Sequence, residues 1–152
     1  MTDKLCNNLN ALAFVKQFKD DSAHIAATLD LPVENILGLA AEESLYGKGR
    51  IATEYNNYFS MHAPAPGQIG DAPALGSKKV RVAKYASFAD CARSFAMRFG
   101  PNVRGKIDPT EFANALVKAG YNTADSQTGG RDDFVEYLVG IIGAVKGRMG
   151  CK

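Results

Sequence analysis

The sequence predicts a mainly helical (α+β) domain with one small β element. In several long segments, apolar residues recur every three or four residues, which is the period of an amphipathic helix. Residues that start and stop helices separate these segments. One short segment, residues 78–85, instead alternates polar and apolar residues, as a half-exposed strand does. At 152 residues the chain is long enough to bury a core of its own, so we predict a single domain over residues 1–152.

Two helices are predicted before the strand. The first spans residues 10–30, where apolar residues such as Phe14 recur at helical spacing, and Ser22 could interrupt it by restarting the helix as an N-cap. Pro32 opens the second helix, because proline is tolerated in a first turn but not in a helix interior. The second helix is mostly apolar and ends at a glycine stop, Gly47.

Three more helices are predicted after the strand, each with a recognisable start or stop signal. The segment before the strand, residues 63–77, is predicted to be irregular because it contains three of the six prolines of the chain. Loops of this length in a compact domain are usually functional or mobile. The three helices run from Ser87 to the pair Gly100-Pro101, from Asp108 to Gly120, and from about Asp132 to Val145.

Composition and charge argue against several classes of protein. The formal net charge of +2 is too small to indicate nucleic-acid binding, and no apolar run approaches transmembrane length. No early apolar run follows a basic start, so no signal peptide is predicted. We therefore expect a chain that is made in the cytoplasm, is already a mature form, or is exported by a route that needs no cleaved signal.

The three cysteines have no metal-type spacing. Cys91 lies in an apolar pattern and is expected in the core. Cys6 and Cys151 lie at opposite ends of the chain, and chain termini are often close together in a domain. A Cys6–Cys151 disulfide is therefore a hypothesis, tied to an oxidising compartment.

Two adjacent glutamates, Glu42 and Glu43, stand just before the glycine stop of the second helix. At roughly 100° per residue, Glu43 falls on the apolar side close to Ile36, whereas Glu42 falls outside the apolar stripe and is expected to be solvated and replaceable. Burial of a carboxyl group disfavours its ionised form and suits it to donating a proton. The pattern fits equally well a structural Glu43 neutralised by an arginine or lysine, so the pattern alone leaves both interpretations open.

Residues 55–62 (Tyr-Asn-Asn-Tyr-Phe-Ser-Met-His) combine aromatic rings with side-chain amides. Amides bond the hydroxyl and acetamido groups of sugars, and ring faces stack on pyranose surfaces. A sugar-binding cleft needs both. Taken alone, however, the segment is more simply a loop whose Tyr58 and Phe59 fill the core.

Four segments, taken in order, resemble a known family. Residues 43–48 (Glu-Ser-Leu-Tyr-Gly-Lys) resemble the Glu-Ser-x-aromatic-Gly-Lys signature of the peptidoglycan glucosaminidases of glycoside hydrolase family 73, in the lysozyme-like superfamily. Residues 56–61 are similar to its Asn-Asn-x-Phe-Gly-Ile/Met segment, residues 87–88 to the helix start after its β-hairpin, and residues 119–121 to its Ala-Gly-Tyr. Order and spacing agree over about residues 14–145. The resemblance implies a lysozyme-like single domain with a small β-hairpin lobe.

The resemblance also implies roles for individual residues. Glu43 matches the family's catalytic acid, which protonates the glycosidic oxygen. The family's second carboxylate, on the β lobe, has no sharp motif here, and Asp71 is the candidate because it is the only acidic residue between His62 and Asp90. The residues that match the lining of the family's sugar cleft are Tyr46, Asn57, Phe59 and Tyr121.

The chain departs from the family pattern at several positions. Leu45 and Ser60 stand where glycine is common. Tyr46 stands where tryptophan is common, and His62 where lysine is frequent. These changes could narrow the sugar cleft or shift its subsite preference.

The implied activity is hydrolysis of the β-1,4 glycan backbone of peptidoglycan by an endo-β-N-acetylglucosaminidase. The second carboxylate would act as base or nucleophile, or the acetamido group of the substrate would replace it. No metal ion or other cofactor is implied. The alternatives are an N-acetylmuramidase of the same fold, a non-catalytic peptidoglycan-binding module, and a helical interaction domain in which Glu43 is an ion-pair partner.

The expected place of action is the periplasm or cell wall of a target cell. Without a predicted signal peptide or a wall-anchoring repeat, the chain fits a phage lysin released by a holin, or an antibacterial effector carried by a contact-dependent secretion machine. An effector would need a cognate immunity protein. Otherwise we expect a monomer that binds peptidoglycan glycan strands, with no nucleic-acid binding and no membrane insertion.

Overall fold

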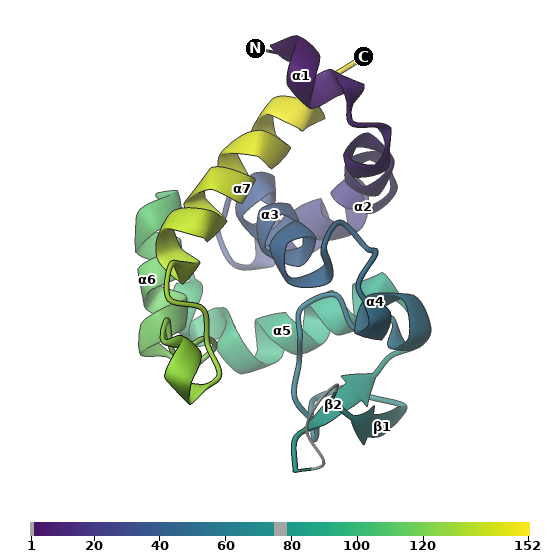
Figure 1. Cartoon of the computed structure of the whole chain (residues 1–152), viewed down its shortest axis with the longest axis vertical. Coiled ribbons are helices and arrows are strands. Elements are labelled where there is room, and N and C mark those ends of the chain that lie inside the picture. The colour runs from purple at the N-terminus through teal and green to yellow at the C-terminus, as the bar shows by residue number, and fades with distance from the viewer. Residues whose placement is uncertain (1, 75–78) are drawn as a thin grey trace.

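The computed structural model describes residues 2–74 and 79–152, and it confirms the mainly helical class with a small β lobe. Residues 75–78, which belong to the predicted irregular segment and the start of the predicted strand, lie outside the described residues. The elements, in the order in which Figure 1 colours them, are α1 (Thr2–Asn7), α2 (Leu9–Thr28), α3 (Val33–Ser44), α4 (Arg50–Tyr55), β1 (Gly70–Pro73), β2 (Arg81–Lys84), α5 (Phe88–Val103), α6 (Pro109–Lys118), the 3-10 helix η1 (Ser126–Thr128) and α7 (Phe134–Met149).

Helix α3 lies at the centre of the molecule, with α2 and α7 packed against it (Figure 1). Every residue from Ile36 to Ala41 is buried, and those other than Gly38 are at most 1% exposed. Because this run covers more than one turn of about 3.6 residues, α3 has no solvent-facing side there. At Gly38, an added Cβ would stand 2.7 Å from Ile142 Cγ1 and 2.9 Å from Ile142 Cα. The backbones of α3 and α7 can approach this closely because Gly38 has no side chain.

The predicted starts of α5 and α6 are confirmed by their caps. The Ser87 hydroxyl accepts a hydrogen bond from the Asp90 N–H at 3.1 Å, and the Asp108 carboxylate accepts one from the Glu111 N–H, also at 3.1 Å. Pro109 is the first residue of α6. The caps pair N–H groups that have no partner inside their own helix.

Two helices continue through a residue at which the sequence predicts a break or an end. α2 is continuous, because Ser22 is buried on its inner side and does not cap a new helix. α5 continues through Pro101 to Val103. A residue that precedes proline usually leaves the helical region because its Cβ clashes with the proline ring, but Gly100 has no Cβ. The sequence does not predict α1, α4 or β1, since each is too short to show a periodic pattern.

Strands β1 and β2 form an antiparallel pair that lies beside α4 (Figure 1). The register places Asp71 opposite Ala83 and Ala72 opposite Val82. Ala72 and Val82 are buried, whereas Asp71 is exposed. Ala83, opposite Asp71, is also buried, so β2 is covered on both faces in its middle and the solvent reaches the sheet at Asp71.

The two ends of the chain lie together (Figure 1), and a Cys6–Cys151 disulfide joins them with its Cα atoms 5.7 Å apart. Leu5 packs on α7 at Gly147, where an added Cβ would stand 2.5 Å from Leu5 Cδ1. The Arg148 Nε–H donates to the Leu5 carbonyl at 3.2 Å. A disulfide typically stabilises a domain by about 2–4 kcal/mol. The disulfide thus fastens the short helix α1 to the end of α7.

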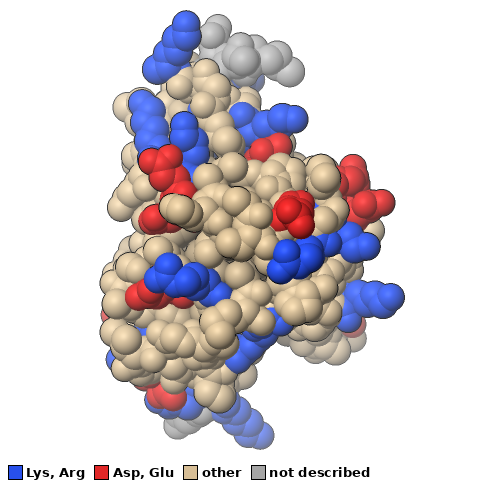
Figure 2. Space-filling view, turned by 180° about the vertical axis from the view of Figure 1, so that it is seen from behind, with Lys and Arg blue, Asp and Glu red and all other residues tan. Residues whose placement is uncertain are grey.

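The surface mixes charges of both signs. On the face that Figure 2 shows, basic and acidic side chains are interspersed rather than gathered by sign. This distribution agrees with the small formal net charge of +2. Among the described residues, none of the helices combines the length and the apolar character needed to cross a bilayer.

We predict that Gly38→Ala lowers the free energy of unfolding by about 1–3 kcal/mol, because the added methyl group would overlap Ile142 and push α3 away from α7. Urea unfolding followed by circular dichroism measures the change. Gly140→Ala on α7 is the matched control, since a Cβ there would meet no atom within 4 Å. It should be neutral or slightly stabilising. Equal stabilities for Gly38→Ala and wild type would contradict the close approach of the two helices.

Candidate active site

Ser44 builds the turn that follows α3 and so fixes the backbone that carries Glu43. The Ser44 hydroxyl donates to the Ala40 carbonyl at 2.6 Å and accepts from the Gly47 N–H at 2.9 Å. The Gly49 N–H returns to the Ser44 carbonyl at 2.8 Å. Ser44 is only 1% exposed, so water does not compete for these bonds. The serine of the Glu-Ser motif therefore stabilises the turn after α3.

Two departures from the family pattern lie where the backbone is left-handed, a conformation that favours glycine. Leu45, Tyr46 and Gly47 have φ values of 53°, 54° and 81°, and Ser60 has a φ of 51°. This conformation costs a residue other than glycine about 1–2 kcal/mol. Leu45 and Ser60 are the positions at which the family commonly has glycine. At Leu45, whose side chain is 63% exposed, the departure therefore strains the backbone without adding a buried side chain.

Glu43 lies half-buried in the last turn of α3, in hydrogen-bonding contact with the Tyr121 hydroxyl. That hydroxyl donates its hydrogen to the Phe59 carbonyl at 2.7 Å. The Tyr121 hydroxyl therefore lies between the Phe59 carbonyl and the Glu43 carboxyl. Burial, and after it the neighbouring Glu43 carboxyl, raises the pKa of Tyr121, which therefore remains a neutral phenol.

Glu42 differs from the expectation that it is solvated. It is half-buried, and its Oε2 atom is fully buried with no hydrogen-bond partner among the described residues. Burial, and after it the contact with the Glu43 carboxyl, raises the pKa of Glu42 well above its usual range. The expectation assumed that α3 has one apolar side and one wet side. Because α3 is covered all round, the neighbour of Glu43 is buried as well.

Asn57 and Phe59 lie in the interior, both 0% exposed. The Asn57 amide accepts from the Met61 N–H and donates to the carbonyls of Met61 and Ala83, each at 2.9 Å. It thereby ties the loop after α4 to strand β2. The Phe59 ring stacks on Phe95 with centroids 5.2 Å apart. This corrects the implied lining of a sugar cleft, because neither side chain reaches solvent and both support the site from within.

Tyr46 contacts a different set of residues from Glu43. Its hydroxyl accepts from Arg148 Nη1 at 2.6 Å, and the Arg148 guanidinium lies 5.2 Å from the ring centroid. Phe14 packs edge-on against the same ring at 5.8 Å. Burial raises the pKa of Tyr46, although the Arg148 charge acts in the opposite direction. A hollow of about 180 Å³ beside Tyr46 combines ring faces with amides, and its lining includes Asn10, Phe14, Gln17, Lys48 and Tyr58.

Asp71 lies on the solvent side of β1 and is paired with Arg81 of β2. Arg81 donates to the same Asp71 oxygen from Nη2 at 2.6 Å and from Nε at 3.1 Å. Both side chains are nearly half-exposed, so this pair is screened by water. Asp71 therefore stands on the β lobe with a cationic partner that the sequence pattern does not indicate.

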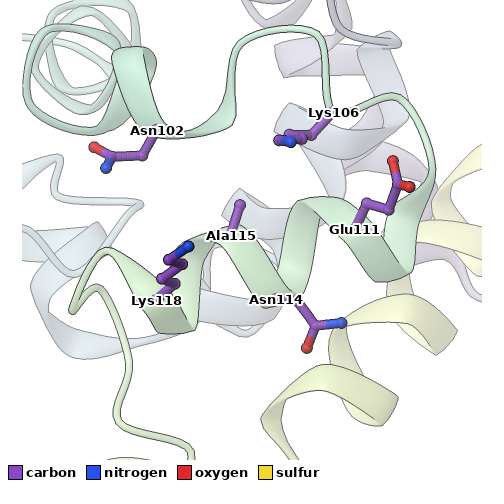
Figure 3. A pocket seen from close by; sticks show the side chains of 6 residues that line it. All are labelled: Asn102, Lys106, Glu111, Asn114, Ala115 and Lys118. Atoms are coloured by element: carbon purple, nitrogen blue, oxygen red, sulfur yellow. The ribbon is translucent and has the colours of Figure 1, made fainter.

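Of the other hollows on the described surface, one lies beside a predicted site residue and one lies apart from all of them. The smaller one, of about 230 Å³, adjoins Tyr121. The larger one, of about 570 Å³, lies between the end of α5 and α6 and contains none of the predicted site residues. Figure 3 shows Lys106 on the loop between these helices and Lys118 near the end of α6. Lining residues of the smaller hollow are Ser60, Met61, His62, Arg98, Phe99, Gly120 and Tyr121, and those of the larger one are Asn102, Lys106, Glu111, Asn114, Ala115 and Lys118.

The structure thus brings Glu43 together with Tyr121, and it places Tyr46, Asn57, Phe59 and Asp71 in other contacts. Sequence reasoning missed two residues of this region, Glu42 and Arg148. A signal for Glu42 was present, since two adjacent carboxyls end an apolar helix. Arg148 gave no signal, because its contact with Tyr46 joins residues that are 102 positions apart.

Comparisons with known proteins bear on the whole chain. The family model for glucosaminidases, described as mannosyl-glycoprotein endo-beta-N-acetylglucosaminidase, matches residues 19–146. No curated protein sequence matches the chain. A chain in the solved structure of a type VI secretion system effector-immunity complex from Pseudomonas protegens is 56% identical, with a TM-score of 0.88, and the match covers 97% of this chain and 99% of that chain.

More distant structures share the fold. A peptidoglycan hydrolase from Sphingomonas sp. A1 is 26% identical with a TM-score of 0.73, and the match covers 91% of this chain and 92% of that chain. A C-terminally truncated glycoside hydrolase domain from Salmonella typhimurium FlgJ is 19% identical with a TM-score of 0.66, over 90% of this chain and 97% of that chain. These likenesses confirm the predicted lysozyme-like fold.

We predict that Leu45→Gly raises the free energy of unfolding by about 0.5–1 kcal/mol. The φ of 53° at Leu45 is strained for leucine and free for glycine, and the exposed side chain contributes little packing. Met97→Gly is the matched control, because Met97 is similarly exposed at 68% but lies within the helix α5. It should lose about 1 kcal/mol. Chemical unfolding should show changes of opposite sign in the free energy of unfolding for the two variants. A loss of stability in both would contradict strain at Leu45.

Proposed function

The chain belongs to the glucosaminidase family, and we propose that it cleaves the β-1,4 glycan backbone of peptidoglycan, on the N-acetylglucosamine side, with Glu43 as the catalytic acid. It is a glycoside hydrolase, as the four ordered motifs imply. The observation that carries the proposal is the position of Glu43. This carboxyl lies near the end of a buried helix and against the Tyr121 hydroxyl. The oxygen of that hydroxyl, whose own hydrogen goes to the Phe59 carbonyl, can accept a hydrogen bond from a protonated carboxyl.

The arrangement supports proton donation to the glycosidic oxygen. Glycoside hydrolases use a protonated carboxyl to assist the departure of the leaving sugar. The Tyr121 oxygen, with its own hydrogen committed to the Phe59 carbonyl, orients the acid form of Glu43. Tyr121, Phe59 and the turn at Ser44 are held by buried contacts, so the acid is positioned before the substrate arrives.

The second carboxylate remains a proposal for Asp71. A spacing of about 6.5–9.5 Å between the two carboxyls would leave room for a water molecule and give inversion, whereas about 5–5.5 Å would suit a nucleophile and retention. Arg81 of β2 is the ion-pair partner of Asp71 on the β lobe. In the alternative path, the acetamido group of the substrate takes this place and Asp71 serves only the β lobe.

We further propose that the protein acts as an antibacterial effector. The solved complex that it resembles contains an effector and an immunity protein, and the glucosaminidase match over residues 19–146 likens this chain to the enzyme of such a pair. This favours an effector over a phage lysin. A cognate immunity protein would then protect the producing cell. The Cys6–Cys151 disulfide suits an oxidising compartment such as the periplasm of the target cell, where the enzyme would act as a monomer.

We predict that Glu43→Gln reduces the release of reducing ends from purified peptidoglycan by about 10²–10⁴-fold, the range that loss of a general acid produces. The amide keeps the shape of the side chain, so circular dichroism and melting temperature should change little. Glu136→Gln on the exposed side of α7 is the matched control and should retain full activity.

Undiminished release by Glu43→Gln would refute the assignment of the catalytic acid. Mass spectrometry of the wild-type products separates the remaining enzyme classes, since new N-acetylglucosamine reducing ends indicate a glucosaminidase and new N-acetylmuramic acid ends a muramidase. Sedimentation with cell walls without any soluble product would instead indicate a binding module.

For Asp71→Asn we expect a loss of about 10²-fold or more in the same assay, since an amide can act neither as base nor as nucleophile. Arg81→Gln is the matched control, because it removes the partner of Asp71 and leaves the carboxylate in place. Activity that survives in Asp71→Asn would exclude Asp71 as the second carboxylate and favour the substrate-assisted path.

A further inference from the structure

The Glu42 carboxyl belongs to the same turn as the proposed acid, yet the mechanism above does not use it. Its Oε2 atom is buried and receives no hydrogen bond from any described residue. The rest of the carboxyl group lies in hydrogen-bonding contact with the Glu43 carboxyl. Two carboxyls in contact can form a hydrogen bond only when one of them carries a proton.

The surroundings favour a single shared proton. An ionised carboxylate buried without donors is costly, and two contacting carboxylates cannot both be ionised near neutral pH. Both glutamates also lie in the last turn of α3, where the unpaired carbonyls of the helix end disfavour negative charge. The pair therefore carries one proton near neutral pH.

The neighbouring charges do not replace that proton. Arg131 and Asp133, in the segment before α7, both act on Glu42, and their effects on its ionisation are opposite. The Arg131 Nε–H donates to Asp133 at 2.6 Å, and its guanidinium lies 3.7 Å from the Tyr137 ring centroid. Arg131 is thus engaged elsewhere at the surface. Tyr121, which faces the pair from the segment after α6, stays neutral.

We propose that Glu42 is a positioning residue for glycan cleavage, which holds against Glu43 the proton that Glu43 delivers to the glycosidic oxygen. This inference rests on the proposed function, because it assigns Glu42 a place in that reaction. The family signature begins at Glu43, so the assignment concerns this chain and not the motif.

The proton that leaves the pair in this step returns to it from water. The proton that Glu42 holds against Glu43 passes to a Glu43 oxygen and from Glu43 to the leaving sugar oxygen, so the pair is briefly without a proton. The bond between that oxygen and the anomeric carbon breaks, and the oxygen of a water molecule, directly or after a covalent intermediate, forms the new bond to the anomeric carbon. One hydrogen of this water stays on the new hydroxyl group, and the other returns a proton to the pair.

The first test is the pH profile of reducing-end release from peptidoglycan for wild type and Glu42→Gln. In the wild type, the alkaline limb reports loss of the last proton of the pair, so activity persists above neutral pH. In Glu42→Gln the amide has no proton to give and instead donates a hydrogen bond to an ionised Glu43. We expect the alkaline limb to move down by about one pH unit or more, with roughly tenfold lower activity at pH 7.5 and at most about a twofold change at pH 4.5.

Glu34→Gln is the matched control, since Glu34 lies half-buried in the first turn of the same helix beside Lys146. Its alkaline limb should coincide with that of the wild type. Glu42→Leu, which removes the buried oxygen altogether, should shift the limb as Glu42→Gln does. Alkaline limbs at the same pH in wild type and both Glu42 variants would overturn the proposal.

The second test does not depend on activity. The pKa of Glu42 is raised in the folded protein, so the folded state retains a proton that the unfolded chain loses above about pH 4.3. The wild type should therefore lose stability relative to Glu42→Gln as pH rises from 4 to 9, with the two melting temperatures closest at pH 4. A difference that does not grow with pH would overturn the shared proton. An inactive wild type that still shows this growing difference would refute the proposed function and keep the proton assignment.

Discussion

The close packing of α3 against α7 at Gly38 and Ile142 is the constraint on which the site depends. A glycine there lets two backbones meet, and it leaves the whole central part of α3 without access to solvent. Burial of each large apolar side chain contributes about 1.5–3 kcal/mol, so the position of this helix is strongly determined. The residues in the last turn of α3, Glu42 and Glu43 among them, are therefore held at a fixed place in the molecule.

The chemistry follows from that burial. A carboxyl at the end of a fully covered helix has little water and faces the negative end of the helix dipole. The Tyr121 hydroxyl contacts the Glu43 carboxyl there and donates its own hydrogen to the Phe59 carbonyl. A second buried carboxyl, Glu42, adds to the cost in folding free energy. Such a cost is common at sites where activity requires a group that stability alone would exclude.

The aromatic and amide residues of the loop after α4 serve the site indirectly. Asn57 completes three hydrogen bonds with buried backbone groups, and removal of such a partner leaves groups that typically cost about 1–3 kcal/mol each. Phe59 supplies the carbonyl that occupies the hydrogen of Tyr121. The motif that looks like a sugar-binding surface in the sequence is thus, in the folded chain, the support that orients the proposed acid.

Local patterns in the sequence determined the helical class and the caps at Ser87 and Asp108, because these depend on spacing within one or two turns. The resemblance to the family, rather than the spacing, singled out Glu43 as the candidate acid. The two positions where the family commonly has glycine, Leu45 and Ser60, coincide with left-handed backbone in the structure. Tertiary structure alone decided three further matters: that Glu42 is buried, that Asn57 and Phe59 face inward, and that Arg148 holds Tyr46. Helical periodicity assumes a wet side and a dry side. It fails for α3, because whether a helix is covered on every side depends on helices far away in the chain.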